Sequence, residues 1–235
     1  MKVFGSSGTR GVANEEVTPA FALRVAKAVG SVFESPAVAV GRDTRVTGQM
    51  LENAVAAGLA ATGKNVERLG VVPTPALQAH AAERGVPAVM VTASHNPPEY
   101  NGLKLVGADG IELALADLER VESTLLGERF EAASWEGAGA DRDVEGARRR
   151  YVEALLSEVD RERIADADLT VALDPGSGAA APTSPEFFRE LGCRVVTLNG
   201  QPDGRFPGRD PEPVEESLAD LGRLVRASDA DVGVA

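Results

Sequence analysis

The chain has 235 residues, of which 43% are hydrophobic, and its 36 acidic and 24 basic side chains give a formal net charge of −12. That hydrophobic content is typical of packed domains and excludes global disorder, and the length allows one large domain or two ordinary ones. The negative charge argues against nucleic acid and anionic membranes as partners, because binding to either needs cations that neutralise phosphate.

Apolar runs alternate with amphipathic segments along the first half of the chain. Thr18 and Pro19 form an N-cap and first-turn pair that predicts a helix to about Glu34. The run AVAV at 37–40 predicts a buried strand, and GRDTR forms the loop after it. We also predict helices at 47–63, 76–84 and 114–126, strands at 66–72 and 87–93, and a short hairpin at 103–113.

The segment 127–143 loses this periodicity and is rich in Gly, Ala and acidic residues, which predicts a linker. Within it, Trp135 is expected to anchor packing. A helix at about 144–159 then opens a second series, with strands in LTVALD and CRVVTL, a helix near 214–227 and a last strand in DVGVA.

Strands that alternate with helices predict an α/β fold, here two consecutive three-layer α/β domains with mostly parallel mixed sheets. The first domain is expected at 1–143 and the second at 144–235. The sequence stops at Ala235 inside a predicted strand. Because ligand loops follow the carboxyl ends of such strands, we expect a truncated or partial chain.

The sequence also bears on the cellular compartment. No apolar run reaches the roughly 18 residues that span a bilayer, and the N-terminus lacks the apolar core of a signal peptide. Cys193 is the only cysteine, which excludes a disulfide framework and a Cys-based metal site. We expect its thiol to be buried and inert, and the protein to be cytoplasmic.

The stretch VTASHNPPEYNG at 91–102 places Ser94 beside His95 at the end of a buried strand. A serine hydrolase needs the imidazole to face the hydroxyl. Neighbouring residues in an extended chain point to opposite sides, so His95 is badly placed unless the loop bends sharply. The G-x-S-x-G pattern is also absent, and we reject this reading.

Phosphoryl transfer is a better reading of the same stretch. A serine at the tip of a strand is exposed while its backbone is held, and Pro97 and Pro98 stiffen the turn. A nucleophile that meets phosphorus in line gains from such fixed positioning. The simpler alternative is a polar turn without chemistry.

Two further motifs favour anion chemistry. GSSGTRG at 5–11 combines three glycines with Arg10 and is suited to hold an anion, although a flexible tail is the alternative. YNGLK at 100–104 brings Lys104 ten positions past Ser94, within reach if the loop folds back. A solvated lysine is the alternative there.

Taken together, GSSGTRG, GRDTR, PTPA, TASHNP and YNGLK resemble the α-D-phosphohexomutase superfamily in order and spacing. In the second half LDPGSGAAA, DGRFPGRDPEP and SDADVGVA resemble the same family's second domain. The resemblance covers essentially the whole chain, and it implies that the family's C-terminal domains are missing from this sequence. It implies an intramolecular phosphotransferase in which phosphorylated Ser94 exchanges its phosphoryl group with hexose phosphates through a sugar bisphosphate.

The resemblance also implies roles for individual residues. His95 and Lys104 match residues with acid–base or charge-stabilising duties, and Arg10 matches an arginine that contacts the phosphoryl group. Arg42 and Asp43 match supports of the serine loop. A sugar bisphosphate is implied as the activator.

The implied metal is Mg²⁺, held by the phosphate on Ser94 and by three aspartates of a D-G-D-A-D loop. No such loop occurs in this sequence, and Asp229 and Asp231 precede the last strand, so the remaining ligands are expected beyond Ala235. The fragment alone is therefore expected to be inactive. The alternative function is a non-catalytic sugar-phosphate-binding or scaffold module.

Overall fold

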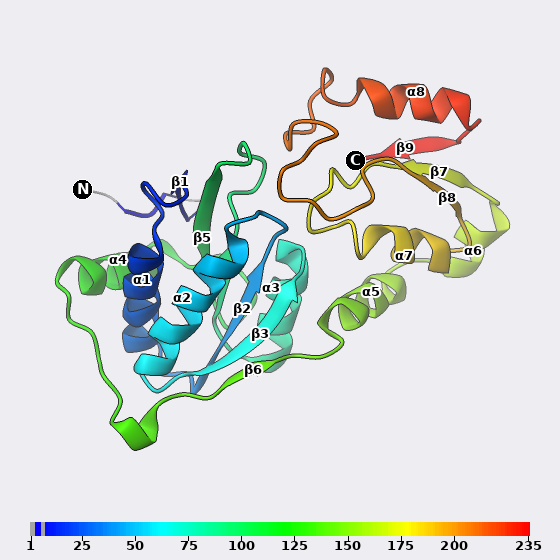
Figure 1. Ribbon diagram of the computed structural model, residues 1–235. Helices are drawn as coiled ribbons and strands as arrows, with labels where there is room; N and C mark the ends of the chain where they lie inside the picture. Colours follow the sequence, from blue (N-terminus) through cyan, green and yellow to red (C-terminus); the bar gives the residue numbers. More distant parts are fainter. Residues whose placement is uncertain (1–2, 6–7) are drawn as a thin grey trace. The chain divides into compact units, whose positions relative to one another are not determined.

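The computed structural model describes residues 3–5 and 8–235, which form two compact units (Figure 1). Unit 1 contains the described part of residues 1–43 together with 47–93 and 99–145. Unit 2 contains 146–235 and two short loops from the first half of the chain, 44–46 and 94–98. Within the described residues, every helix is too short or too polar to cross a membrane.

Unit 1 is built on a six-stranded mixed sheet. In spatial order its strands are β1 (Thr9–Val12), β5 (Tyr100–Val106), β4 (Ala88–Val91), β2 (Ala37–Arg42), β3 (Asn65–Val71) and β6 (Asp141–Asp143). The four strands from β4 to β6 run parallel, whereas β5 runs antiparallel to both β4 and β1.

Helices cover both faces of this sheet. Helices α1 (Pro19–Val32), α2 (Gly48–Ala61) and α4 (Leu115–Leu126) share one hydrophobic core with Val38 and Val40 of β2. The next residue, Gly41, faces the other way, because a Cβ there would lie 3.5 Å from Leu77 of α3 (Thr74–Arg84). Unit 1 is therefore a three-layer α/β domain, as predicted.

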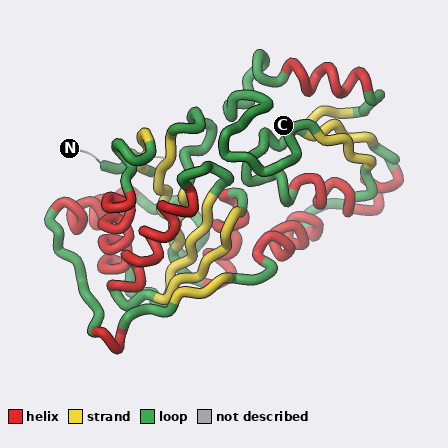
Figure 2. The backbone as a smooth tube through the Cα atoms, in the orientation of Figure 1, coloured by secondary structure: helices red, strands yellow, loops and turns green. Residues whose placement is uncertain are grey.

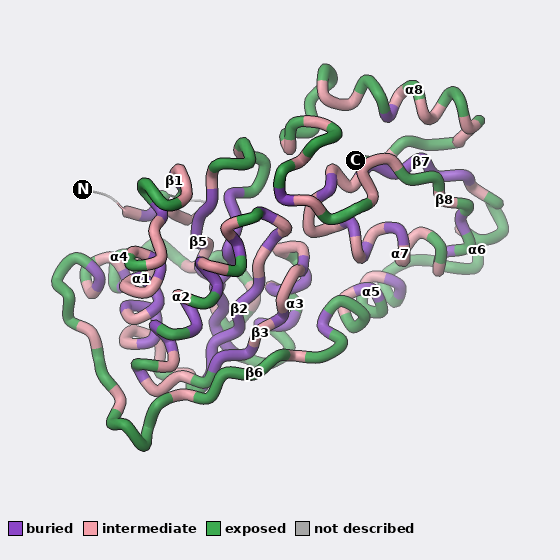
Figure 3. The backbone as a smooth tube through the Cα atoms, viewed as in Figure 1, coloured by how far each residue is buried: buried purple, intermediate pink, exposed green. Residues whose placement is uncertain are grey.

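The first helix begins where its sequence predicts. The Thr18 Oγ1 accepts a hydrogen bond from the Phe21 N–H at 3.1 Å, and Pro19 occupies the first turn. The apolar face of α1 then packs on α2 and α4. Figure 3 shows the buried stretches of unit 1 along α1, α2 and the central strands.

The predicted hairpin at 103–113 was wrong in extent. Residues 100–106 form β5, a long strand between β1 and β4. Only its end belongs to a hairpin, closed by an antiparallel bridge between Val106 and Glu112 and by a hydrogen bond from the Leu113 N–H to the Leu105 carbonyl at 3.4 Å. Gly102 allows this pairing, because a Cβ there would lie 2.2 Å from the Thr9 carbonyl oxygen and 2.8 Å from that of Thr92. The sequence resembles a loop because its Tyr-Asn-Gly start is typical of turns.

The segment 127–143 is more than a linker. It contains a short 3₁₀ helix (Trp135–Gly137) and the edge strand β6, which pairs with β3. The charged sequence of β6 suits an exposed sheet edge. Because it contains no apolar residue, the hydrophobic pattern did not predict this strand. The predicted packing role of Trp135 was also wrong, since this residue is 88% exposed on the 3₁₀ turn.

Unit 2 has a parallel sheet in the order β8 (Arg194–Thr197), β7 (Thr170–Leu173) and β9 (Val232–Val234). Helices α5 (Ala147–Ser157) and α7 (Ser184–Glu190) pack with β7 and β8 in one core. Helix α6 (Arg161–Asp166) precedes β7, and α8 (Ala219–Ala227) packs on β7 and β9. Figure 2 marks these strands in yellow and helices in red.

The two faces of the β7–β9 sheet carry different helices. Val171 and Leu173 belong to the core that includes α5 and α7. A Cβ at Gly233 would lie 2.8 Å from Val225 of α8, which places α8 on the opposite face. The predicted fold class, two consecutive three-layer α/β domains with mostly parallel sheets, is confirmed. Cys193 lies in the α5–α7 core and is 8% exposed, as expected for a structural thiol.

Candidate active site

The candidate site is built from four loops of unit 2. The loops at 44–46 and 94–98 follow β2 and β4 in the chain, and the segments starting at Asp174 and Leu198 follow β7 and β8. Thr44 Oγ1 donates to the Ser177 carbonyl at 3.0 Å, and Arg45 forms a β-bridge with Gly204. All four loops thus leave the carboxyl ends of parallel strands, where open α/β sheets bind ligands.

Gly204 allows the closest of these approaches. A Cβ at this position would lie 2.2 Å from the Thr44 carbonyl oxygen and 2.5 Å from the Arg45 Cα, both of which are backbone atoms. Only glycine allows the DGRFP segment to pair with the loop that carries Arg45.

Ser94 is exposed and has a left-handed backbone conformation, with φ at 56°. For a residue with a Cβ this conformation costs about 1–2 kcal/mol. Such strain persists only where surrounding contacts enforce it, and it concentrates at functional positions.

Arg45 supplies those contacts. Its guanidinium donates to the carbonyl oxygens of Ser94 at 3.0 Å, Asn96 at 2.6 Å and Pro97 at 2.6 Å. The side chain is only 1% exposed, and its guanidinium carbon lies 5.2 Å from the centre of the Phe206 ring. One buried cation therefore holds three backbone carbonyl groups of the serine loop in place.

His95 lies beside the serine hydroxyl. Its Nδ1 is 3.4 Å from Ser94 Oγ, and its Nε2 is 3.3 Å from Oε2 of Glu212. The two neighbours would point apart in an extended chain, but the loop bends sharply at Ser94, where a left-handed φ replaces the extended geometry.

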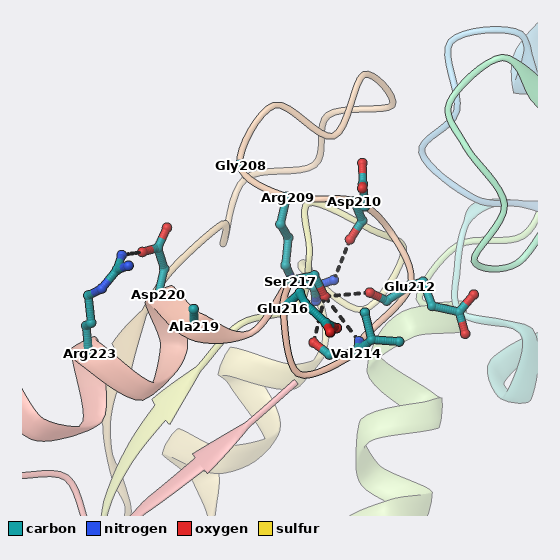
Figure 4. A pocket seen from close by; sticks show the side chains of 10 residues that line it. All are labelled: Gly208, Arg209, Asp210, Glu212, Val214, Glu216, Ser217, Ala219, Asp220 and Arg223. Atoms are coloured by element: carbon teal, nitrogen blue, oxygen red, sulfur yellow. Dashed lines mark hydrogen bonds and ion pairs between the residues drawn. The ribbon is translucent and has the colours of Figure 1, made fainter.

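A pocket of about 410 Å³ adjoins this pair, lined by His95, Asn96, Pro97, Asp210, Pro211 and Glu212. A neighbouring pocket of about 460 Å³ lies between the 208–217 segment and the start of α8 (Figure 4). The candidate site thus has space for a small molecule on the side of His95.

The 208–212 segment is itself fixed to the end of β7. Arg209 Nε pairs with Asp174 Oδ2 at 2.8 Å, and both side chains are buried. The same guanidinium donates to the carbonyl oxygens of Asp210 at 2.9 Å and Pro211 at 3.3 Å. Asp174 also accepts from the Gly176 N–H at 2.8 Å, so its charge is well compensated.

Arg10 and Lys104 lie in unit 1 on neighbouring strands. Arg10 is opposite Gly102 in the β1–β5 pair, and Lys104 of β5 places its Nζ 2.5 Å from Glu112 Oε1. A Cβ at Gly8 would lie 2.4 Å from the Leu103 carbonyl oxygen, so Gly8 lies directly against β5. Ser6 and Ser7 of this motif lie outside the described residues. The joint action of Arg10 and Lys104 with Ser94 stays a prediction.

Asp43 and Arg42 differ in what they support. Asp43 Oδ2 accepts from Thr92 Oγ1 at 2.6 Å, and the Asp43 N–H donates to Val91, which joins the ends of β2 and β4 just before Ser94. Arg42 instead pairs with Glu52 of α2 at 3.1 Å. Burial raises the pKa of Glu52, and Arg42 and Arg68 oppose that rise.

Comparison with known proteins identifies the fold and the motifs. Residues 1–132 match the family model described as phosphoglucomutase/phosphomannomutase, alpha/beta/alpha domain I, and residues 149–235 match domain II of that family. The chain belongs to the phosphoglucomutase/phosphomannomutase family.

Curated relatives align with this chain over its whole length. It is 45% identical to "Phosphoglucomutase/phosphomannomutase" of Thermococcus kodakarensis, with 100% of the chain and 52% of the relative covered. It is also 45% identical to "Probable phosphoglucosamine mutase" of Methanopyrus kandleri, with 100% and 51% covered. The chain therefore spans about half the length of these relatives.

Solved structures give the same picture. A phosphoglucomutase/phosphomannomutase family protein from Burkholderia thailandensis matches with a TM-score of 0.86 and 32% identity, over 99% of this chain and 51% of that one. A putative phosphomannomutase from Thermus thermophilus matches with a TM-score of 0.83 and 33% identity, over 95% and 52%. The α-D-phosphohexomutase resemblance is thereby confirmed.

Membership of this family implies Mg²⁺, and the described residues were tested for a site. Residues 3–5 and 8–235 contain no group of three or more His, Cys, Asp or Glu side chains arranged to hold a metal ion. Ser94 Oγ lies 3.4 Å from an imidazole nitrogen of His95, whereas Mg²⁺ prefers oxygen ligands in octahedral geometry. These residues alone do not fit the metal.

Sequence reasoning missed two residues of this phosphohexomutase-family site. Arg45 was seen only as the last letter of GRDTR, and its role depends on a loop 49 residues further on. Glu212 lies in the PEP sequence 117 positions after His95 in the chain (212 − 95). The only local signals were a basic residue after a strand and an acid between two prolines, and neither reveals a distant partner.

Proposed function

We propose that the protein is a phosphohexomutase that interconverts hexose 1-phosphate and hexose 6-phosphate through phosphorylated Ser94 and a sugar bisphosphate. The observation that carries the proposal is the exposed Ser94, which the buried Arg45 holds in a strained turn beside His95. The family membership and the mutase names of the relatives support this reading.

In this mechanism Ser94 carries the phosphoryl group. When Ser94 Oγ attacks the phosphorus of a bisphosphate, an O–P bond forms and the bond from phosphorus to the sugar oxygen breaks. His95 is positioned to take the Oγ proton, and the same proton then neutralises the departing sugar oxygen. The reverse step, on the other hydroxyl of the sugar, completes the isomerisation.

Charge is the main obstacle to this transfer. Phosphoserine carries about −1.5 to −2 charges near neutral pH, and the substrate brings a second phosphate. Two unit charges 4 Å apart repel by about 4 kcal/mol at an effective dielectric constant of 20. We assign Arg10 and Lys104 to offset part of this repulsion. Mg²⁺, with oxygen ligands in addition to phosphorylated Ser94, completes the proposal for the whole protein, and a sugar bisphosphate serves as its activator.

The test is a coupled assay of hexose 1-phosphate conversion, with glucose, mannose and glucosamine phosphates as substrates. Protein purified from its native host is expected to convert at least one of them, and the Ser94→Ala variant is expected to lose at least about a thousandfold, because no nucleophile remains. The 235-residue chain alone is expected to show negligible turnover.

Two results would contradict the proposal. If the Ser94→Ala variant turned over as fast as the wild type, phosphorylated Ser94 could not be an intermediate of the reaction. Binding of sugar phosphates by the native-host protein without conversion of any of them would favour a non-catalytic sugar-phosphate-binding module instead.

A further inference from the structure

Both ring nitrogens of His95 are engaged, and by different groups. Nδ1 lies 3.4 Å from Ser94 Oγ, and Nε2 lies 3.3 Å from the Glu212 carboxylate. In a neutral imidazole one nitrogen carries the proton and the other presents a lone pair. A carboxylate accepts hydrogen bonds and donates none, so the proton of a neutral His95 belongs on Nε2.

The backbone of Glu212 is held from both sides. Ser217 Oγ donates to the Glu212 carbonyl oxygen at 2.6 Å, and Arg209 binds the preceding carbonyl oxygens of Asp210 and Pro211. Figure 4 shows the Glu212 carboxylate pointing away from Ser217. The carboxylate is thus presented outward from a fixed loop.

The His95–Glu212 pair contributes little to folding. The two side chains are 50% and 51% exposed, and ion pairs in contact with water add little to stability. The two loops that carry this pair are nevertheless firmly held. Arg45 holds the loop at 94–98, and the buried Arg209–Asp174 pair holds the 208–212 segment. Because the His95–Glu212 contact adds little stability and joins two firmly held loops, its effect is to orient the His95 imidazole.

We propose that Glu212 is the positioning residue for His95: it accepts the Nε2 proton and keeps the Nδ1 lone pair facing Ser94 Oγ. This inference rests on the proposed function, since a base beside Ser94 has a purpose only if that hydroxyl reacts. In this role Glu212 acts on Ser94 only through the imidazole of His95. Its counterpart in other sites is the carboxylate that fixes a catalytic histidine.

The experiment is imidazole ¹⁵N NMR on the 235-residue chain, which needs no catalytic activity. The chain contains two histidines, His80 and His95, so a His95→Gln spectrum assigns both. His80 is buried against Glu67 at 3.0 Å in unit 1 and serves as an internal reference. Under conditions where the imidazole is neutral, the wild-type His95 is expected to be almost entirely the Nε2–H tautomer.

Three variants separate positioning from charge. Glu212→Ala is expected to increase the Nδ1–H tautomer of His95 severalfold without changing the signals of His80. Glu212→Gln keeps an acceptor oxygen and is expected to retain the wild-type tautomer. Glu216→Ala removes an equal charge from the same segment and is expected to leave His95 unchanged.

Identical tautomer ratios in the wild type and Glu212→Ala would overturn the inference, as would a Glu212→Gln spectrum that matches Glu212→Ala. A thermal unfolding curve of each variant excludes loss of fold as the cause. Because this readout does not require phosphorylation of Ser94, its failure is distinct from failure of the proposed function.

Discussion

Arg45 shows how one residue determines the shape of the serine loop. Its guanidinium reaches three carbonyl oxygens, which a planar group with five donors can do and an ammonium does less well. Hydrogen bonds from a charged donor contribute about 1.5–3 kcal/mol each. Their sum exceeds the roughly 1–2 kcal/mol that the left-handed Ser94 costs. The strained turn is therefore stable as long as Arg45 stays in place.

The first prediction concerns Arg45→Lys. The shorter reach of the ammonium should release at least one carbonyl oxygen, so amide exchange at 94–98 should accelerate. Phosphorylation of Ser94 should slow by at least about tenfold, which corresponds to about 1.4 kcal/mol. Arg205→Lys is the matched control, because Arg205 lies in the neighbouring segment and is 77% exposed. Equal loop exchange in both variants would contradict the role given to Arg45.

At the scale of elements, the fold followed from the pattern where apolar residues dominate. The N-cap at Thr18, the buried run in β2 and the αL glycine that ends α3 are local signals, and the structure contains each of these elements. The pattern failed at β6, a charged edge strand, and at the start of β5, where an Asn-Gly pair forms part of a strand.

The candidate site likewise has features that local sequence predicts and features that it does not. Ser94 and His95 were predictable because they follow a buried strand and belong to a short motif. The contact between them was not, because it depends on a left-handed φ. Arg45 contacts Ser94, and Glu212 contacts His95, across long stretches of the chain. Both contacts depend on how the loops pack, and no local spacing encodes them.

The second prediction compares two glycines of unit 2. Gly204→Ala places a methyl group against the Thr44 and Arg45 backbone, neither of which yields easily, and should destabilise unit 2 by about 1–3 kcal/mol. Gly222→Ala, within α8, meets only the Arg226 side chain at 3.7 Å and should stabilise by roughly 0.5–1 kcal/mol. Denaturant unfolding of both variants measures the difference. A Gly204→Ala protein as stable as Gly222→Ala would contradict the close approach.

At the scale of the whole molecule, a buried carboxylate joins three elements of unit 1. Glu67 of β3 is 1% exposed and contacts His80 and Arg84 of α3 at 3.0 and 3.1 Å and Arg142 beside it at 2.8 Å. Burial alone would raise its pKa, but the hydrogen bonds from Arg84, Arg142 and His80 prevail and lower the pKa to about 2. The strand, the helix and the edge strand β6 thereby depend on one charge.

The third prediction follows from that pKa. A carboxyl whose folded pKa is below its unfolded value of 4.5 contributes its full stability above 4.5 and loses it as the pH falls toward 2. The shift corresponds to about 3 kcal/mol at neutral pH. Glu67→Gln should therefore unfold at a lower temperature near neutral pH and depend less on pH between 4.5 and 2.

Glu83→Gln is the control for this measurement, since it removes an exposed carboxylate from α3, the helix that Glu67 contacts. Its unfolding temperature should follow that of the wild type across the pH range. If Glu67→Gln showed the same acid dependence as the wild type, the charge on Glu67 would not be what holds these elements together.

The most direct measurement is phosphopeptide mapping of the protein from its native host, before and after incubation with a hexose bisphosphate. Cleavage after Arg84 and Lys104 isolates residues 85–104, which contain Ser94. If Ser94 carries the phosphoryl group, this peptide gains the mass of one HPO₃ group, localised to Ser94 and absent from Ser94→Ala. A peptide that stays unmodified under both conditions, or that carries the group on Thr92 or Tyr100, would contradict that role of Ser94.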